Sequence, residues 1–165
     1  GIRDYKVTGV QTCALPICEK NLDAGELLVR ARKLVSLCRS AGVAVIVNDR
    51  PDVALLSEAD GVHLGQSDLP CAEARKLVGR QLLIGVSTSN LAQAQQALRD
   101  GADYCGVGPM FNTTTKHKDV IVGSAYLREY VAWNKLPHLA IGGINAARVA
   151  ELRAAGVKEI GRAHV

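Results

Sequence analysis

The chain has 165 residues, a formal net charge of +4 and 48% hydrophobic residues, which suits one soluble domain and excludes global disorder. It has no apolar run of about 18 residues, so no membrane-spanning segment is expected. The modest charge forms no basic block and aromatic residues make up only 4%, so nucleic acid is not an expected partner. Five irregularly spaced cysteines favour a reduced, cytoplasmic setting over a disulfide framework.

The two ends of the chain read as non-native sequence. Read as codons, residues 12–17 and 159–165 can come from complementary strands of one DNA segment, which resembles a sequencing-library adapter. We therefore expect residues 1–18 and 159–165 to be adapter-derived and exclude them from fold reasoning. Residues 19–158, 140 in number, are then the natural segment.

Within that segment, helical and strand patterns alternate. The expected helices share apolar residues at helical spacing and cover residues 26–39, 70–78, 91–99, 125–133 and 146–155. The expected strands are short apolar runs at 43–47, 61–65, 82–86, 104–107 and 139–144. Strands that alternate with helices in this way predict βα units and a parallel sheet.

The position of the polar residues favours a (β/α)8 TIM barrel over a doubly wound sheet. Polar residues follow nearly every expected strand, and a barrel draws its catalytic groups from the ends of several strands. A doubly wound sheet would concentrate its site at one switch point, and no glycine-rich nucleotide motif is present. An eight-stranded barrel needs roughly 200 residues or more. The natural segment is therefore expected to be an incomplete barrel.

Two carboxylates follow consecutive expected strands. Asp49 and Asp68 would be neighbours in a barrel, where carboxylates completed by substrate phosphates hold Mg²⁺. The alternative gives each a separate structural role, with Asp49 capping a helix near Arg50-Pro51 and Asp68 capping the helix near Pro70. Spacing alone leaves both interpretations open.

Three further strand ends carry polar residues or glycines. The loop residues 113–116, Thr-Thr-Thr-Lys, can bind phosphate or form an ordinary polar loop. Residues 87–90 can cap the helix that follows or bind an anion at its N-terminus. Gly142-Gly143 can allow close approach to a phosphate or form a tight turn.

The histidines and cysteines point less strongly to chemistry. His63, inside an expected strand, is better explained as a hydrogen-bonded barrel residue than as a base. Cys38, Cys71 and Cys105 are scattered and read as structural thiols rather than as a zinc site.

Five motifs together resemble the thiamine-phosphate synthase family. Their order and spacing match that family across residues 19–158. They are V-N-D-R at 47–50, G-V-H-L-G-Q-S-D-L-P at 61–70, I-G-V-S-T at 84–88, G-V-G-P-M-F at 106–111 and A-I-G-G-I at 140–144. The resemblance implies a (β/α)8 barrel enzyme, a transferase of thiamine biosynthesis. Such an enzyme couples a pyrimidine diphosphate with a thiazole phosphate to give thiamine phosphate and pyrophosphate.

The resemblance also implies roles for individual residues. Asn48 and Ser87 would contact the pyrimidine diphosphate. Lys20 and Lys116 would contact its diphosphate, and Lys20, Ser87 and Lys116 are the expected catalytic residues.

The remaining implied contacts concern the second substrate and the metal. Thr113, Thr115 and Gly123 would bind the thiazole phosphate. Asp49 and Asp68 would bind Mg²⁺ as the cofactor. In this family the pyrimidine diphosphate is thought to ionise to a stabilised carbocation before the thiazole nitrogen attacks. That chemistry needs charge stabilisation more than acid–base groups.

The family pattern also predicts what is missing. The first βα unit, the second strand and the last strand and helix of the barrel are expected to be absent, so the chain itself is expected to be inactive. Two other hypotheses stay open: a thiazole tautomerase-like barrel, and an inert chimeric translation product.

Overall fold

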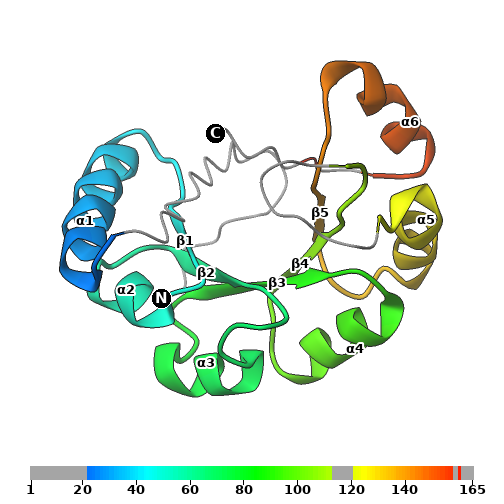
Figure 1. The fold of residues 1–165 in the computed structure, drawn as a ribbon. Helices are drawn as coiled ribbons and strands as arrows, with labels where there is room; N and C mark the ends of the chain where they lie inside the picture. The colour runs from blue at the N-terminus through cyan, green and yellow to red at the C-terminus, as the bar shows by residue number, and fades with distance from the viewer. Residues whose placement is uncertain (1–21, 113–120, 158–159, 161–165) are drawn as a thin grey trace. The chain divides into compact units, whose positions relative to one another are not determined.

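The computed structural model describes residues 22–112, 121–157 and 160. Helices and strands alternate along these residues (Figure 1), and the strands form one parallel five-stranded sheet in the order β1-β2-β3-β4-β5. The α/β fold and the parallel sheet are therefore confirmed. Lys20, Thr113, Thr115 and Lys116 lie outside the described residues.

The chain divides into two compact units, residues 1–85 and 86–165, within β3 (Leu83–Thr88). The first unit contains α1 (Ala24–Ser40), β1 (Ile46–Asn48), α2 (Pro51–Leu56), β2 (Gly61–Leu64) and α3 (Cys71–Val78). The second contains α4 (Leu91–Arg99), β4 (Tyr104–Val107), α5 (Gly123–Trp133), β5 (His138–Ala140), the 3₁₀ turn η1 (Ala146–Arg148) and α6 (Val149–Ala154).

In the first unit, α1 packs through one apolar face. Leu27, Ala31 and Val35 are buried at spacings of four residues, as a helix with one buried stripe requires. Asp23 starts the helix, because its side chain accepts a hydrogen bond of 2.8 Å from the Glu26 amide. The helices of this unit lie on one side of β1 and β2 (Figure 1).

The amino ends of three strands meet at Asp60. Its carboxylate accepts a 2.8 Å hydrogen bond from the Val45 amide, and its own amide donates to the Val45 carbonyl at 2.9 Å. Its carbonyl accepts from the Leu83 amide at 2.9 Å. One residue before β2 therefore helps to set the register of β1, β2 and β3.

In the second unit, β4 and β5 pair in parallel, with Gly106 opposite Leu139. Ala140 also forms a parallel bridge with Ile160, so the chain after α6 returns to the edge of β5. The expected strand 139–144 is too long. It ends at Ala140 because Gly142 and Gly143 turn the backbone through positive φ.

Other element boundaries also differ from those expected. The apolar run 43–47 contributes only its last residues to β1, which extends to Asn48. The expected helix 146–155 begins as the 3₁₀ turn η1, and α6 starts at Val149. No helix within the described residues is long and apolar enough to cross a membrane.

Candidate active site

The first group of predicted site residues lies where β1 ends. Asn48 is the last residue of β1 and pairs with His63 of β2. The Asp49 amide donates to the His63 carbonyl at 2.8 Å, and Asp49 has φ +63°. That conformation is rare outside glycine and costs about 1–3 kcal/mol, and such residues concentrate at functional sites. Asp49 therefore leaves the sheet in a strained conformation at the predicted site.

Asp68 lies just past the end of β2 and is held by a tight turn. Its Oδ2 accepts a 2.6 Å hydrogen bond from the Gly65 amide. A Cβ on Gly65 would lie 2.9 Å from that oxygen, so a side chain at this position would displace the carboxylate. The described residues give Oδ1 no hydrogen bond, which leaves that oxygen available as a ligand atom.

Neither carboxylate belongs to the N-cap residue of the helix that follows it. The N-cap of α2 is Arg50 and that of α3 is Pro70, and neither of these residues forms a side-chain capping hydrogen bond. Arg50 instead pairs with Asp52 at 2.6 Å. The hydrogen bond from Arg50 lowers the pKa of Asp52. Asp49 and Asp68 are thus not the N-cap residues of these helices.

The second group begins at the carboxyl end of β3. Ser87 is half-buried in that strand, and α4 begins four residues later. Asn90 caps α4 by accepting a 3.0 Å hydrogen bond from the Gln93 amide, while Gln93 Oε1 accepts one of 2.8 Å from the Ser89 amide. The pair is a variant of the capping box, in which the Gln93 side chain bonds the residue before the N-cap instead of the N-cap residue itself. It confirms capping as a role of residues 87–90.

A buried polar cluster follows Ser87 directly. The Tyr126 hydroxyl donates a 2.8 Å hydrogen bond to Thr88 Oγ1, which in turn donates to the Gly106 carbonyl at 3.3 Å. Burial raises the pKa of Tyr126 to about 12, so its phenol keeps its proton at neutral pH. Burial also raises the pKa of the nearby Cys105 thiol.

Sequence reasoning missed this cluster. The sequence analysis assigns Thr88 to the polar stretch 87–90 after an expected strand and places Tyr126 in an expected helix, and nothing in the sequence connects the two. The one sequence signal is a hydroxyl-bearing side chain on each of two buried elements.

Gly123 is the first residue of α5. It has φ +59°, and among the described residues outside its own chain neighbours and helix backbone no atom lies within 4 Å of where its Cβ would be. The Val122 amide before it donates to the Pro109 carbonyl at 3.0 Å, which ties the start of α5 to the segment after β4.

Gly142 and Gly143 pack against the segment that follows β4. The Phe111 amide donates to the Gly142 carbonyl at 3.0 Å. A Cβ on Gly142 would meet Pro109 at 2.7 Å, and one on Gly143 would collide with the Asn112 carbonyl oxygen. These contacts support the tight-turn interpretation of the glycine pair.

The cysteines and the buried His138 lie among packed side chains. Cys71 and Cys105 are buried, Cys38 is half-buried, and none of the three forms a disulfide within the described residues. The His138 ring lies 5.1 Å from the Tyr130 ring. Among residues 22–112, 121–157 and 160, no three His, Cys, Asp or Glu side chains are grouped as metal ligands.

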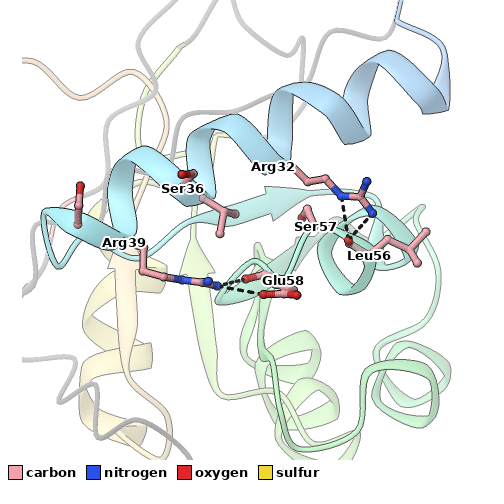
Figure 2. A pocket seen from close by; sticks show the side chains of 8 residues that line it. Arg32, Ser36, Arg39, Leu56, Ser57 and Glu58 are labelled. Carbon is pink, nitrogen blue, oxygen red and sulfur yellow. Dashed lines mark hydrogen bonds and ion pairs between the residues drawn. The ribbon is translucent and has the colours of Figure 1, made fainter.

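A groove of about 610 Å³ between α1 and α2 contains none of the predicted site residues (Figure 2). Two arginines of α1 reach across it. Arg32 donates to the Leu56 carbonyl at 3.2 Å, and Arg39 donates to the Glu58 carbonyl at 3.2 Å. Both carbonyls lie at or just past the C-terminus of α2, where a helix lacks internal donors. The arginines therefore stabilise the end of α2.

Comparisons with known proteins identify the family. The sequence model of the family "Thiamine monophosphate synthase" matches residues 7–162. A thiamine-phosphate synthase of Prochlorococcus marinus is 50% identical over 143 residues, which cover 86% of this chain and 40% of the relative. One of Chloroflexus aurantiacus is 49% identical over 146 residues, which cover 86% of this chain and 66% of the relative.

Solved structures agree. The thiamine phosphate pyrophosphorylase of Pyrococcus furiosus matches with a TM-score of 0.77 and 38% identity, covering 86% of this chain and 67% of that one. FabK of Thermotoga maritima, at 19% identity and a TM-score of 0.63, shares the fold alone. The chain thus spans between two fifths and two thirds of the length of these synthase relatives. It belongs to the thiamine monophosphate synthase family.

Proposed function

We propose that this chain carries part of the active site of a thiamine-phosphate synthase, which couples a pyrimidine diphosphate with a thiazole phosphate. The observation that carries the proposal is the pair Asp49 and Asp68. Each follows one of two adjacent parallel strands, and neither is the N-cap residue of the helix that comes after it. Family membership supports the proposal, and relatives at 49–50% identity are named thiamine-phosphate synthase.

The two carboxylates fit Mg²⁺. Mg²⁺ prefers oxygen ligands and is usually bound by one or two carboxylates together with substrate phosphates. The Gly65 amide holds Oδ2 of Asp68, which orients the carboxylate as second-sphere hydrogen bonds do in metal sites. When bound, the ion would neutralise charge on the leaving pyrophosphate.

The chain's own residues would bind and orient the two substrates. Asn48 and Ser87 would hold the pyrimidine diphosphate, with Lys20 and Lys116 on its phosphates. The C–O bond between the pyrimidine methylene and the diphosphate breaks, and its electron pair leaves with pyrophosphate. The thiazole nitrogen then forms the new C–N bond to that methylene carbon.

The second substrate would lie at the start of α5. Gly123 begins that helix and brings no side chain to it, and its backbone amide would contact the phosphate. Thr113 and Thr115 would complete the thiazole-phosphate contacts. Holding both substrates in a reactive geometry is the main catalytic contribution we assign to the protein.

We also infer that the five-stranded sheet is part of a (β/α)8 barrel. The Pyrococcus structure supports this, as do the polar residues at the ends of β1, β2 and β3. We also propose a cytoplasmic location, which fits buried cysteines that are not joined in disulfides within the described residues.

The test compares matched carboxamide variants. The 165-residue chain and the full product of its source gene are assayed with both substrates, with and without Mg²⁺. In the full product we expect Mg²⁺-dependent thiamine phosphate formation. Asp49→Asn and Asp68→Asn should each lose about 100-fold in rate, because each removes a charged metal ligand. Asp52→Asn is the control, since Asp52 pairs with Arg50 at the surface.

Two results would contradict the proposal. One is the absence of product from the full gene product at any Mg²⁺ concentration. The other is isomerisation of a thiazole phosphate without coupling, which would favour a tautomerase. Equal losses in all three variants would remove the special role of Asp49 and Asp68.

A further inference from the structure

The hydrogen bond between Thr88 and Tyr126 joins the two elements, β3 and α5, that carry the predicted substrate contacts Ser87 and Gly123. Thr88 directly follows Ser87 at the end of β3, and Tyr126 lies three residues after Gly123 in the first turn of α5. Residues three apart lie on adjacent turns of one helix face. The 2.8 Å bond between the two hydroxyls thus fixes the start of α5 to the end of β3.

The anchor is buried and has further hydrogen bonds. Thr88 is 1% exposed and Tyr126 6% exposed. The Thr88 hydroxyl also donates to the Gly106 carbonyl of β4, and the Thr88 carbonyl accepts from the Gly108 amide at 3.1 Å. Thr88 is therefore held on both its side chain and its backbone, and Tyr126 binds to a fixed partner.

Stability alone does not account for this polar pair. Replacing both partners of a buried hydrogen bond by apolar groups of the same shape is often nearly neutral. A hydrogen bond adds direction, which apolar packing does not. The raised pKa of Tyr126 extends the range in which its phenol can donate to pH values above 10.

We propose that Thr88 and Tyr126 are positioning residues that set the distance between the pyrimidine contact at Ser87 and the thiazole-phosphate contact at Gly123. This inference rests on the proposed function. Without the anchor each substrate still has its own contacts, but the thiazole nitrogen is misplaced relative to the reacting methylene carbon. Water then competes better for that carbon, giving the pyrimidine alcohol and a proton in place of thiamine phosphate.

The experiment measures how the product partitions in the full product of the source gene. Thr88→Val and Tyr126→Phe remove the hydrogen bond with little change in shape, and Thr88→Ser restores the hydroxyl. Tyr130→Phe is the matched control. It removes another buried phenol from the same helix, whose bond goes to the Leu136 carbonyl beyond the end of α5.

In the two disrupting variants we expect the ratio of thiamine phosphate to pyrimidine alcohol to fall about tenfold or more, since small misplacements are costly to oriented reactions. KM for each substrate should change little. Thr88→Ser and Tyr130→Phe should keep the wild-type ratio. The ratio does not depend on how much enzyme is folded, so a merely structural role would leave it unchanged.

The outcomes separate the two claims. The positioning role is overturned if the wild-type protein forms thiamine phosphate and Thr88→Val and Tyr126→Phe give the same product ratio as Tyr130→Phe. The proposed function would then remain intact. A wild-type protein that forms no thiamine phosphate overturns both. If Thr88→Val fails to fold, the comparison of Tyr126→Phe with Tyr130→Phe decides alone.

Discussion

Residues with positive backbone φ angles differ in what surrounds the position of their Cβ atom. Gly143, with φ +64°, leaves no room for a side chain because the Asn112 carbonyl occupies the position of a Cβ. Gly42, with φ +67°, has open space there. Asp49 has a similar φ but is not glycine. At Gly42 only the backbone angle disfavours a side chain. At Gly143 a side chain would also collide with the Asn112 carbonyl.

This difference gives a paired prediction. Gly42→Ala should destabilise the fold by about 1–2 kcal/mol, the cost of a Cβ in the left-handed region. Gly143→Ala should cost about 1–3 kcal/mol more, because the segment around Asn112 must move. Denaturant unfolding of both variants measures the difference. Equal losses of unfolding free energy in the two variants would show that the segment around Asn112 moves aside at no energetic cost.

At the scale of elements, sequence periodicity locates helices and strands better than it locates their ends. The expected helix 91–99 and strand 104–107 coincide with α4 and β4. Both are bounded by residues with a clear local role, such as the Asn90 cap. The strand expected at 139–144 is apolar through Ile144, yet β5 ends at Ala140 because backbone conformation at the glycine pair overrides hydrophobicity.

The candidate site shows the same limit. From sequence, the carboxylates that follow two consecutive strands indicate Asp49 and Asp68 as candidate Mg²⁺ ligands. Spacing does not decide whether they cap helices, since that depends on which residue occupies the N-cap in three dimensions. The Thr88–Tyr126 bond was not predictable, because it joins residues 38 positions apart through tertiary packing.

The capping box of α4 can be tested directly. Asn90→Ala should destabilise the fold by about 1 kcal/mol by leaving the Gln93 amide without its acceptor. Asn90→Asp keeps an acceptor and adds a charge favourable at a helix N-terminus, so it should retain stability. Thermal unfolding of both variants checks this. A loss in the aspartate variant equal to that in alanine would contradict the capping role.

At the scale of the whole molecule, the described tyrosines make the fold sensitive to alkali. Burial raises the pKa of Tyr104, Tyr126 and Tyr130 above the ordinary value. An unfolded tyrosine ionises near pH 10. The stability that these phenols contribute is therefore complete below about pH 10 and is lost as pH rises through the folded values.

We accordingly expect unfolding to begin above about pH 10, with tyrosinate absorbance rising together with loss of helical circular dichroism. Tyr126, whose pKa is raised to about 12, should ionise only as the structure opens. Tyr126→Phe should shift the onset to higher pH. Tyrosinate that forms fully while the circular dichroism stays native would contradict the prediction.

The hydrogen bonds of Asp60 have a consequence for how this fold tolerates sequence change. Asp60 joins the amino ends of β1, β2 and β3, while Asp49, Asp68 and Ser87 follow or lie near the carboxyl ends of the same strands. Because strand register is fixed at one end, the loops at the other end can change length or residue type without shifting the sheet. Mutational tolerance should therefore be low around Asp60. New substrate preferences can then arise at the opposite ends without loss of the scaffold.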